Sequence, residues 1–181
     1  MRPFFNLIVV CVSFLMVSFM ISSCNNTTKW AEYTSKEGSF SVFMPADVKK
    51  TDKKYGKQVI HFVTWKPSSF ALDKFKLFEV SYTDVPGAVG ADTARLNILL
   101  DTSISNRKKD FTDLDVDAQP IVLNGYPGRA FIFQQSRGST VTIVKECIVG
   151  NKRYDLTVIS KKDYPTNIEM NKFFNSFHVL R

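Results

Sequence analysis

Cysteine is scarce in this sequence, with three residues in 181, and its placement excludes a disulfide framework. Cys11 and Cys24 belong to the hydrophobic N-terminal run or stand at its end, so the body of the chain keeps only Cys147 and cannot form an internal disulfide. Cys147 stands in an apolar, strand-like stretch, which predicts a buried small side chain rather than a reactive thiol. Stability must therefore come from a hydrophobic core.

The common motifs of catalysis and cofactor binding are also missing. The chain has no Cys-x-x-Cys pair, no glycine-rich phosphate loop and no Gly-x-Ser-x-Gly nucleophile elbow. Its two histidines, His61 and His178, are too few for a zinc site without further ligands, and we expect both to be structural. We therefore predict no catalytic residue, no metal and no cofactor, and a protein that is not an enzyme.

Three alternating aspartates, Asp113, Asp115 and Asp117, resemble the opening of a calcium-binding loop. Such a loop needs a glycine at its sixth position and a glutamate at its twelfth, where this chain has Ala118 and Asn124. The pattern therefore predicts the polar face of an extended segment.

Residues 1–23 contain one charged side chain, Arg2. A run of mostly large apolar residues follows from Phe4 and ends in Ile21-Ser22-Ser23-Cys24. A basic start, an apolar core and small residues at the end are typical of a secretory signal peptide. The last four residues resemble the lipobox of bacterial lipoproteins, in which the cysteine thiol receives diacylglycerol and becomes the first residue of the mature protein.

An uncleaved membrane helix is the alternative, because the run is about long enough to span a bilayer. A membrane helix does not need small residues and a cysteine at its outer end, so we favour lipidation of Cys24 and attachment to the membrane through that lipid. Asn25, which is not Asp, resembles the sorting rule for the outer rather than the inner membrane. We expect a lipid-anchored protein of the cell envelope that faces the periplasm.

Without residues 1–23 the chain keeps 158 residues, with 23 basic and 17 acidic side chains and a net charge of +6. That length suits one domain. We divide the chain into a signal peptide at 1–23, a polar tether at 24–36 and a single domain at 37–181. The positive charge is consistent with anionic lipid headgroups, and export argues against nucleic acid as a partner.

Alternating apolar and polar residues predict strands at 40–44, 58–65, 77–83, 120–123, 129–135, 140–149 and 153–160. A helical stripe at 92–107, capped by Asp92, predicts one helix, and a second begins near Pro165. The second helix is expected to cover a sheet face with Ile168, Met170, Phe173, Phe174 and Phe177. The turn sequences Asn124-Gly125 and Gly150-Asn151 separate strands. Together these elements predict an α+β domain, an antiparallel sheet flanked by helices.

Residues 46–57 hold little apolar material and contain Lys49, Lys50, Lys53, Lys54 and Lys57. We interpret this segment as a solvated loop. The alternative is a patch that docks a partner.

Four segments carry a family resemblance: EGSFSVFMP at 37–45, LNGYPGR at 123–129, CIVGNKRYDLTV at 147–158 and FFNSF at 173–177. Their order and spacing resemble the PsbP-like superfamily, which includes an extrinsic protein of photosystem II and many bacterial envelope lipoproteins. The resemblance implies an α/β/α sandwich over the whole mature domain. It also implies a mostly non-enzymatic role without a common ligand, so no functional residue is carried over.

We therefore expect a non-catalytic envelope module that binds or helps to assemble another envelope component, and we expect this partner to be an envelope protein, whose identity the sequence does not give. Two alternatives remain open: a carrier of a small apolar ligand, suggested by 20 aromatic residues in the mature chain, and an envelope hydrolase. Converging polar groups in a cavity would favour the hydrolase, and a large open apolar cavity the carrier. A filled core with an exposed patch would favour the binding module.

Overall fold

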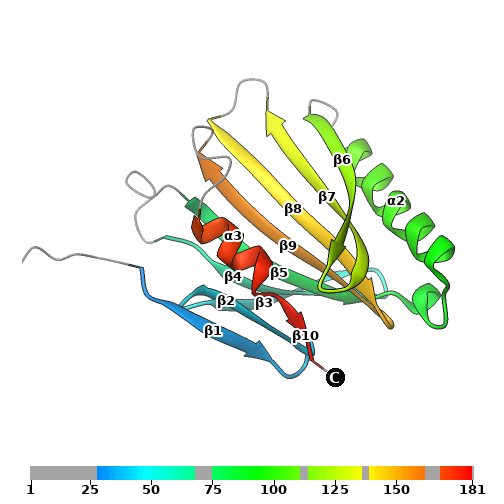
Figure 1. Ribbon diagram of the computed structural model, residues 1–181, viewed down its shortest axis with the longest axis horizontal. Coiled ribbons are helices and arrows are strands. Elements are labelled where there is room, and N and C mark those ends of the chain that lie inside the picture. Colours follow the sequence, from blue (N-terminus) through cyan, green and yellow to red (C-terminus); the bar gives the residue numbers. More distant parts are fainter. Residues whose placement is uncertain (1–27, 68–74, 111–113, 136–138, 162–167, 181) are drawn as a thin grey trace, which may run out of the picture.

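The computed structural model describes residues 28–67, 75–110, 114–135, 139–161 and 168–180 (Figure 1). Its centre is a seven-stranded antiparallel sheet with the strand order β3-β4-β5-β9-β8-β7-β6. The strands are β3 (Lys49–Tyr55), β4 (Gln58–Trp65), β5 (Phe75–Asp84), β6 (Leu114–Leu123), β7 (Tyr126–Gln135), β8 (Thr140–Val149) and β9 (Lys152–Lys161).

A layer packs on each face of this large sheet (Figure 1). One face carries the long helix α2 (Thr93–Asp110), which follows the short 3-10 helix η2 (Pro86–Ala88). The other carries α3 (Ile168–Asn175) and a small sheet of order β1-β2-β10, made of β1 (Trp30–Ser35), β2 (Phe40–Pro45) and β10 (His178–Val179). We call these the α2 face and the α3 face. The predicted α+β class and the layered antiparallel sheet are confirmed.

Most of the core lies on the α3 face. Phe40, Val42 and Met44 of β2 are almost completely buried against large-sheet residues such as Val80, Leu156 and Val158. These residues are the alternating apolar positions of their strands, so the period of two in the sequence does identify this face. Among the described residues, no helix is long and apolar enough to cross a membrane.

The closing helix α3 supplies Met170, Phe173 and Phe174 to this core, and Phe177 is buried just beyond its end. The prediction for Ile168 is wrong, because its side chain is 84% exposed. Each residue turns an α-helix by about 100°, so Ile168 lies roughly 160° away from Met170 and faces solvent. Pro165, where the helix was expected to begin, lies outside the described residues.

On the α2 face the apolar contacts are fewer. Ile104 packs with Phe131, Phe133 and Val144, and Leu100 packs with Ala88 and Ile148. The helix begins as predicted, since the Asp92 carboxylate accepts a 2.8 Å hydrogen bond from the backbone N–H of Arg95.

Two turns have the expected chemistry. Asn124 and Gly125 both have positive φ between β6 and β7, as a tight hairpin requires, and Gly150 has positive φ between β8 and β9. Gly128, three residues after the first of these turns, lies inside β7. A Cβ there would stand 2.3 Å from the carbonyl oxygen of Glu146 on β8, so the glycine permits close approach of two strands.

The lysine-rich segment is not a loop. Residues 49–55 form β3, an edge strand in which every residue is exposed, and it pairs with β4 through a turn at Gly56 and Lys57. Because both faces of β3 meet solvent, it shows no apolar period, and sequence patterning could not detect it. Lysines on an edge strand discourage pairing with another sheet.

The predicted tether at 24–36 is also too long. Residues 30–35 form β1, which pairs with β2 and packs Trp30 and Tyr33 against the core. The rest of the strand is mostly exposed and polar, which explains why the segment resembled a tether.

Candidate functional site

Of the predicted site residues, the structure describes the five lysines but not Cys24. The five lysines do not form one patch, because side chains alternate across a strand. Lys50 and Lys54 pair with Val63 and Val59 and lie on the α3 face, whereas Lys49 and Lys53 lie on the α2 face, and Lys57 lies in the turn.

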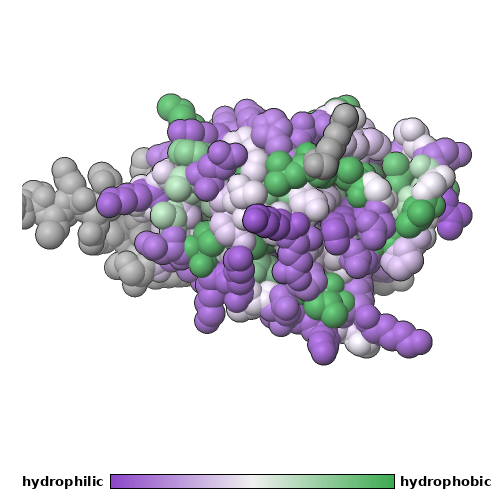
Figure 2. All heavy atoms as spheres, turned by 90° about the horizontal axis from the view of Figure 1, so that it is seen from below, coloured by the Kyte–Doolittle hydropathy of each residue, from purple (hydrophilic) through white to green (hydrophobic). Residues whose placement is uncertain are grey.

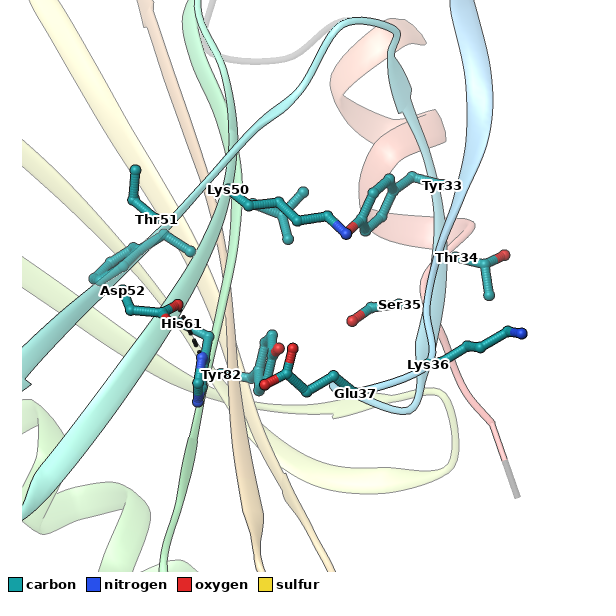
Figure 3. A pocket seen from close by; sticks show the side chains of 12 residues that line it. Tyr33, Thr34, Ser35, Lys36, Glu37, Lys50, Thr51, Asp52, His61 and Tyr82 are labelled. Carbon is teal, nitrogen blue, oxygen red and sulfur yellow. Dashed lines mark hydrogen bonds and ion pairs between the residues drawn. The ribbon is translucent and has the colours of Figure 1, made fainter.

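A hollow of about 580 Å³ opens between β1 of the small sheet and the β3–β4 hairpin of the large sheet (Figure 3). We call it the junction hollow. Thr34 and Lys36 point away from it, while other side chains surround it: Tyr33, Ser35, Glu37, Lys50, Asp52, His61 and Tyr82.

The junction hollow combines aromatic surfaces with charges of both signs. The His61 ring stacks on Tyr82 with 4.7 Å between centroids, and its Nδ1 lies 2.9 Å from a carboxylate oxygen of Asp52. The Lys50 ammonium lies 5.5 Å from the centroid of the Tyr33 ring, whose buried hydroxyl has no hydrogen-bond partner among the described residues. Burial raises the pKa of Tyr82. These groups suit hydrogen bonding and stacking with a small polar ligand.

The two histidines lie on different sheets with different partners. His178 of β10 has its Nδ1 3.1 Å from the side-chain amide nitrogen of Asn124, whereas His61 of β4 contacts Asp52. Within the described residues no group of three or more His, Cys, Asp or Glu side chains could hold a metal ion.

Sequence reasoning missed a cluster of buried charges beneath α2. Glu146 of β8 is completely buried and stands directly opposite Asp155 of β9, which is 7% exposed. Arg107 of α2 reaches both, with its Nη2 2.5 Å from Asp155 and 3.5 Å from Glu146. Ser103 of α2 donates a 2.9 Å hydrogen bond to Glu146, and Arg153 lies 3.7 Å from Asp155.

The two carboxyl groups of this cluster differ in their affinity for protons. Burial, reinforced by the neighbouring Asp155 charge, raises the pKa of Glu146 to about 8. Burial also acts to raise the pKa of Asp155, but the charges of Arg107 and Arg153 hold it below its usual range. Glu146 Oε1 and Asp155 Oδ1 are the buried carboxyl oxygens without another hydrogen-bond partner in the described residues. A side-chain hydrogen bond between protonated Glu146 and Asp155 acts in the same sense, since it raises the pKa of the glutamic acid and lowers that of the aspartate.

A signal for Glu146 was present in the sequence. It alternates with Val144 and Ile148, so a strand that buries these two residues buries the glutamate as well. The partners Asp155 and Arg107 could not be found in the same way, because they meet Glu146 only through strand pairing and helix placement.

A groove of about 770 Å³ runs between α2 and the β4–β5 side of the sheet. Its walls include the apolar residues Val59, Leu99 and Ile148, and Ser103 and Arg153 contribute its polar part. Glu146 and Asp155 do not line it, so the cluster presents its serine and arginine, but not its carboxyl groups, to this α2 groove.

Cys147 is buried as predicted, and part of the aspartate repeat lies in an extended segment. Burial raises the pKa of the Cys147 thiol to about 12, and the residue is free and has no exposed surface. Asp115 and Asp117 lie in the extended strand β6, while Asp113 falls outside the described residues.

No family model and no curated protein matches this chain. Among solved structures, one crystal structure of a protein from Bacteroides thetaiotaomicron VPI-5482 is 10% identical over 83% of this chain, with a TM-score of 0.45. This chain spans 48%, about half, of the length of that protein. The solution structure of cyanobacterial PsbP (CyanoP) from Synechocystis sp. PCC 6803 is 9% identical, with a TM-score of 0.52, over 88% of this chain and 99% of the other. The identity is low, so the likeness concerns the fold alone: the described domain has a PsbP-like fold.

Proposed function

We propose that this protein is a lipid-anchored, non-catalytic binding or assembly module of the bacterial cell envelope. The observation that carries the proposal is how closely the folded domain follows Cys24. The backbone N–H of Ala46 donates a 2.7 Å hydrogen bond to the carbonyl of Lys29, so the fold already holds the chain five residues after the cysteine. Five residues span at most about 17 Å, which would keep the domain next to the membrane surface.

The placement of the charged groups supports binding rather than catalysis. The carboxyl groups with the most perturbed proton affinity, Glu146 and Asp155, are buried under α2 and engaged with Arg107 and Arg153. A general acid or base must reach the substrate proton directly or through one water. The groups that a partner can reach are instead the lysines of β3 and the charged and aromatic side chains around the junction hollow.

Replacement of Cys24 by serine tests the anchor. We expect wild-type protein to carry acyl chains by mass spectrometry and to fractionate with the outer membrane, as Asn25 predicts. Cys24→Ser should remain unmodified and should not be processed by the lipoprotein pathway. A serine variant that is processed and membrane-bound like wild type would show that the lipobox interpretation is wrong.

A second candidate function, carriage of a small apolar ligand, is favoured by the α2 groove. Its volume of about 770 Å³ falls in the range typical of ligand sites, about 300–1,000 Å³, and Val59, Leu99 and Ile148 give it apolar walls. Organic extraction of the purified protein followed by mass spectrometry would detect a carried ligand. Leu99→Lys should abolish its recovery if the groove holds it.

A further inference from the structure

The topology gathers lysines at one end of the domain. At this end β1 and β3 begin and β4 ends, next to the start of β5 and the end of β9 (Figure 1). We call it the tail end, because the chain enters the fold there at Lys29, beside Ala46. The lysines that the strands and α3 place there are Lys29, Lys49, Lys66, Lys76, Lys161 and Lys172.

The charge at the tail end is mainly positive. Among the described residues its acidic side chains are Glu32, Asp47, Glu79 and Glu169. Glu79 is partly buried, accepts a hydrogen bond from Thr64 and interacts with the charge of Lys66. Lys29, Lys49, Lys66 and Lys172 are exposed. Lys29 lies where the chain enters the fold, Lys49 begins β3, and Lys66 directly follows β4. The face on which β1 and β3 lie is mostly hydrophilic, with small separate apolar areas (Figure 2).

The tail end also holds both tryptophans of the chain. Trp30 begins β1 and Trp65 ends β4, and each keeps part of its surface exposed while its ring packs against Phe78. Ile168, 84% exposed, stands at the first residue of α3, where the chain re-enters the described fold after the end of β9. Tryptophan, exposed aliphatic side chains and lysine are the residue types that favour the boundary between lipid headgroups and water.

We propose that the tail end docks on an anionic lipid surface and so fixes the orientation of the domain on the membrane. The proposal rests on the proposed lipid anchor at Cys24. It assigns the membrane contact to Lys29, Lys49 and Lys66, not to the whole lysine strand.

Distance separates these lysines from Lys54 and Lys57 of the β3–β4 hairpin. Lys54 and Lys57 lie at or beyond the far end of β3, which spans six residue steps or roughly 20 Å. Attraction to a charged surface falls off within a Debye length, about 8 Å at physiological ionic strength. With the tail end on the membrane, Lys54 and Lys57 are therefore too far away to contribute.

The two tryptophans provide a native probe of docking. Full-length protein, purified from membranes, is reconstituted into phosphatidylcholine vesicles with and without phosphatidylglycerol, each containing a lipid with a nitroxide on its headgroup. We expect stronger quenching of tryptophan fluorescence in the anionic vesicles, and a loss of that difference in high salt. Lys49→Gln with Lys66→Gln should lower the ratio of docked to undocked protein about thirtyfold, at about 1 kcal/mol per lysine.

The matched control is Lys54→Gln with Lys57→Gln, which removes the same charge from the opposite end of the hairpin and should leave quenching unchanged. Circular dichroism and the melting temperature of both double variants establish that they are folded. If the control lowers quenching as much as the tail-end pair, the domain lies along β3 and the proposal is wrong. Quenching that ignores lipid charge overturns it as well. Loss of the anchor is detected separately, because protein without acyl chains fails to float with vesicles and lacks the mass of the lipid.

Discussion

Glu146 gives the most direct test of how the buried cluster stabilises the domain. The glutamate is completely buried, and its pKa is raised to about 8 because burial disfavours the charged form. In the unfolded chain the same group has an ordinary pKa near 4.5. Between these two values the folded protein binds a proton that the unfolded chain does not bind. Stability is therefore highest below the lower value and is lost as the pH rises through the upper one.

The size of the effect follows from the linkage. The free energy of unfolding should fall by about 1.4 kcal/mol per pH unit while only the folded state holds the proton. Asp155 does not cancel this trend, because its lowered pKa affects stability only in more acidic solution. Over the whole window the loss amounts to several kcal/mol, a large part of the roughly 5–15 kcal/mol that stabilises a typical domain.

Glu146→Gln removes the titrating group and keeps its shape. The amide can donate to Asp155 and accept from Ser103, as a protonated glutamic acid does. We expect the variant to match wild type near pH 5 and to be more stable than wild type at pH 9. Urea unfolding of residues 25–181 at a series of pH values measures both. The variant keeps every other ionisable group of wild type, so the difference between the two pH profiles reports on Glu146 alone. Equal pH profiles for the two proteins would mean that Glu146 is ionised and solvated in the folded state.

Further substitutions test other parts of the fold. Phe173→Ala or Phe177→Ala should each destabilise the domain by about 3–5 kcal/mol, because both rings are almost completely buried; an unchanged urea midpoint for Phe177→Ala would mean that this residue is a docking element. Gly128→Ala should lower the melting temperature markedly, since its Cβ would stand 2.3 Å from the Glu146 carbonyl oxygen, whereas Lys53→Ala on the exposed strand should not change it. Reductants and chelators should leave the melting temperature unchanged, and a shift of several degrees would contradict a fold built without disulfide or metal.

Sequence patterning found the elements that are rich in core apolar residues. β4 and β8 were predicted with the observed bounds, because both strands supply apolar side chains to the core, β8 from both of its faces. The turn at Asn124 and Gly125 was predicted because its positive φ values restrict the residue types.

The elements that patterning missed supply few or no apolar side chains to the core. β3 is exposed on both faces, so its lysines look like a loop, and the strand exists only because β4 offers an edge for pairing. In β1 only Trp30 and Tyr33 of the large side chains pack on the core. Two residues in a polar segment are too few for a periodic signal.

The charged cluster beneath α2 depends on the register in which the strands pair, which the residue pattern of a single strand does not give. Pairing of β5, β9, β8 and β7 aligns Ser81, Asp155, Glu146 and Arg129 in one polar row across the α2 face. Of these residues only Glu146 and Asp155, on the two strands of the β8–β9 hairpin, are close in the sequence. The row becomes visible only when these four strands have their correct partners.

This polar row explains why α2 lies where it does. The helix has a small apolar contact, with Leu100 and Ile104 as its buried large residues. This contact alone would allow the helix to slide along the sheet. Polar contacts along its length remove that freedom. Arg129 reaches Asp101, Ser103 bonds to Glu146, and Arg107 reaches Asp155. Buried polar groups fix a unique arrangement when each finds its partner, because any shift leaves a charge unpaired. The cluster is therefore best understood as the device that positions α2, which in turn forms one wall of the groove beside it.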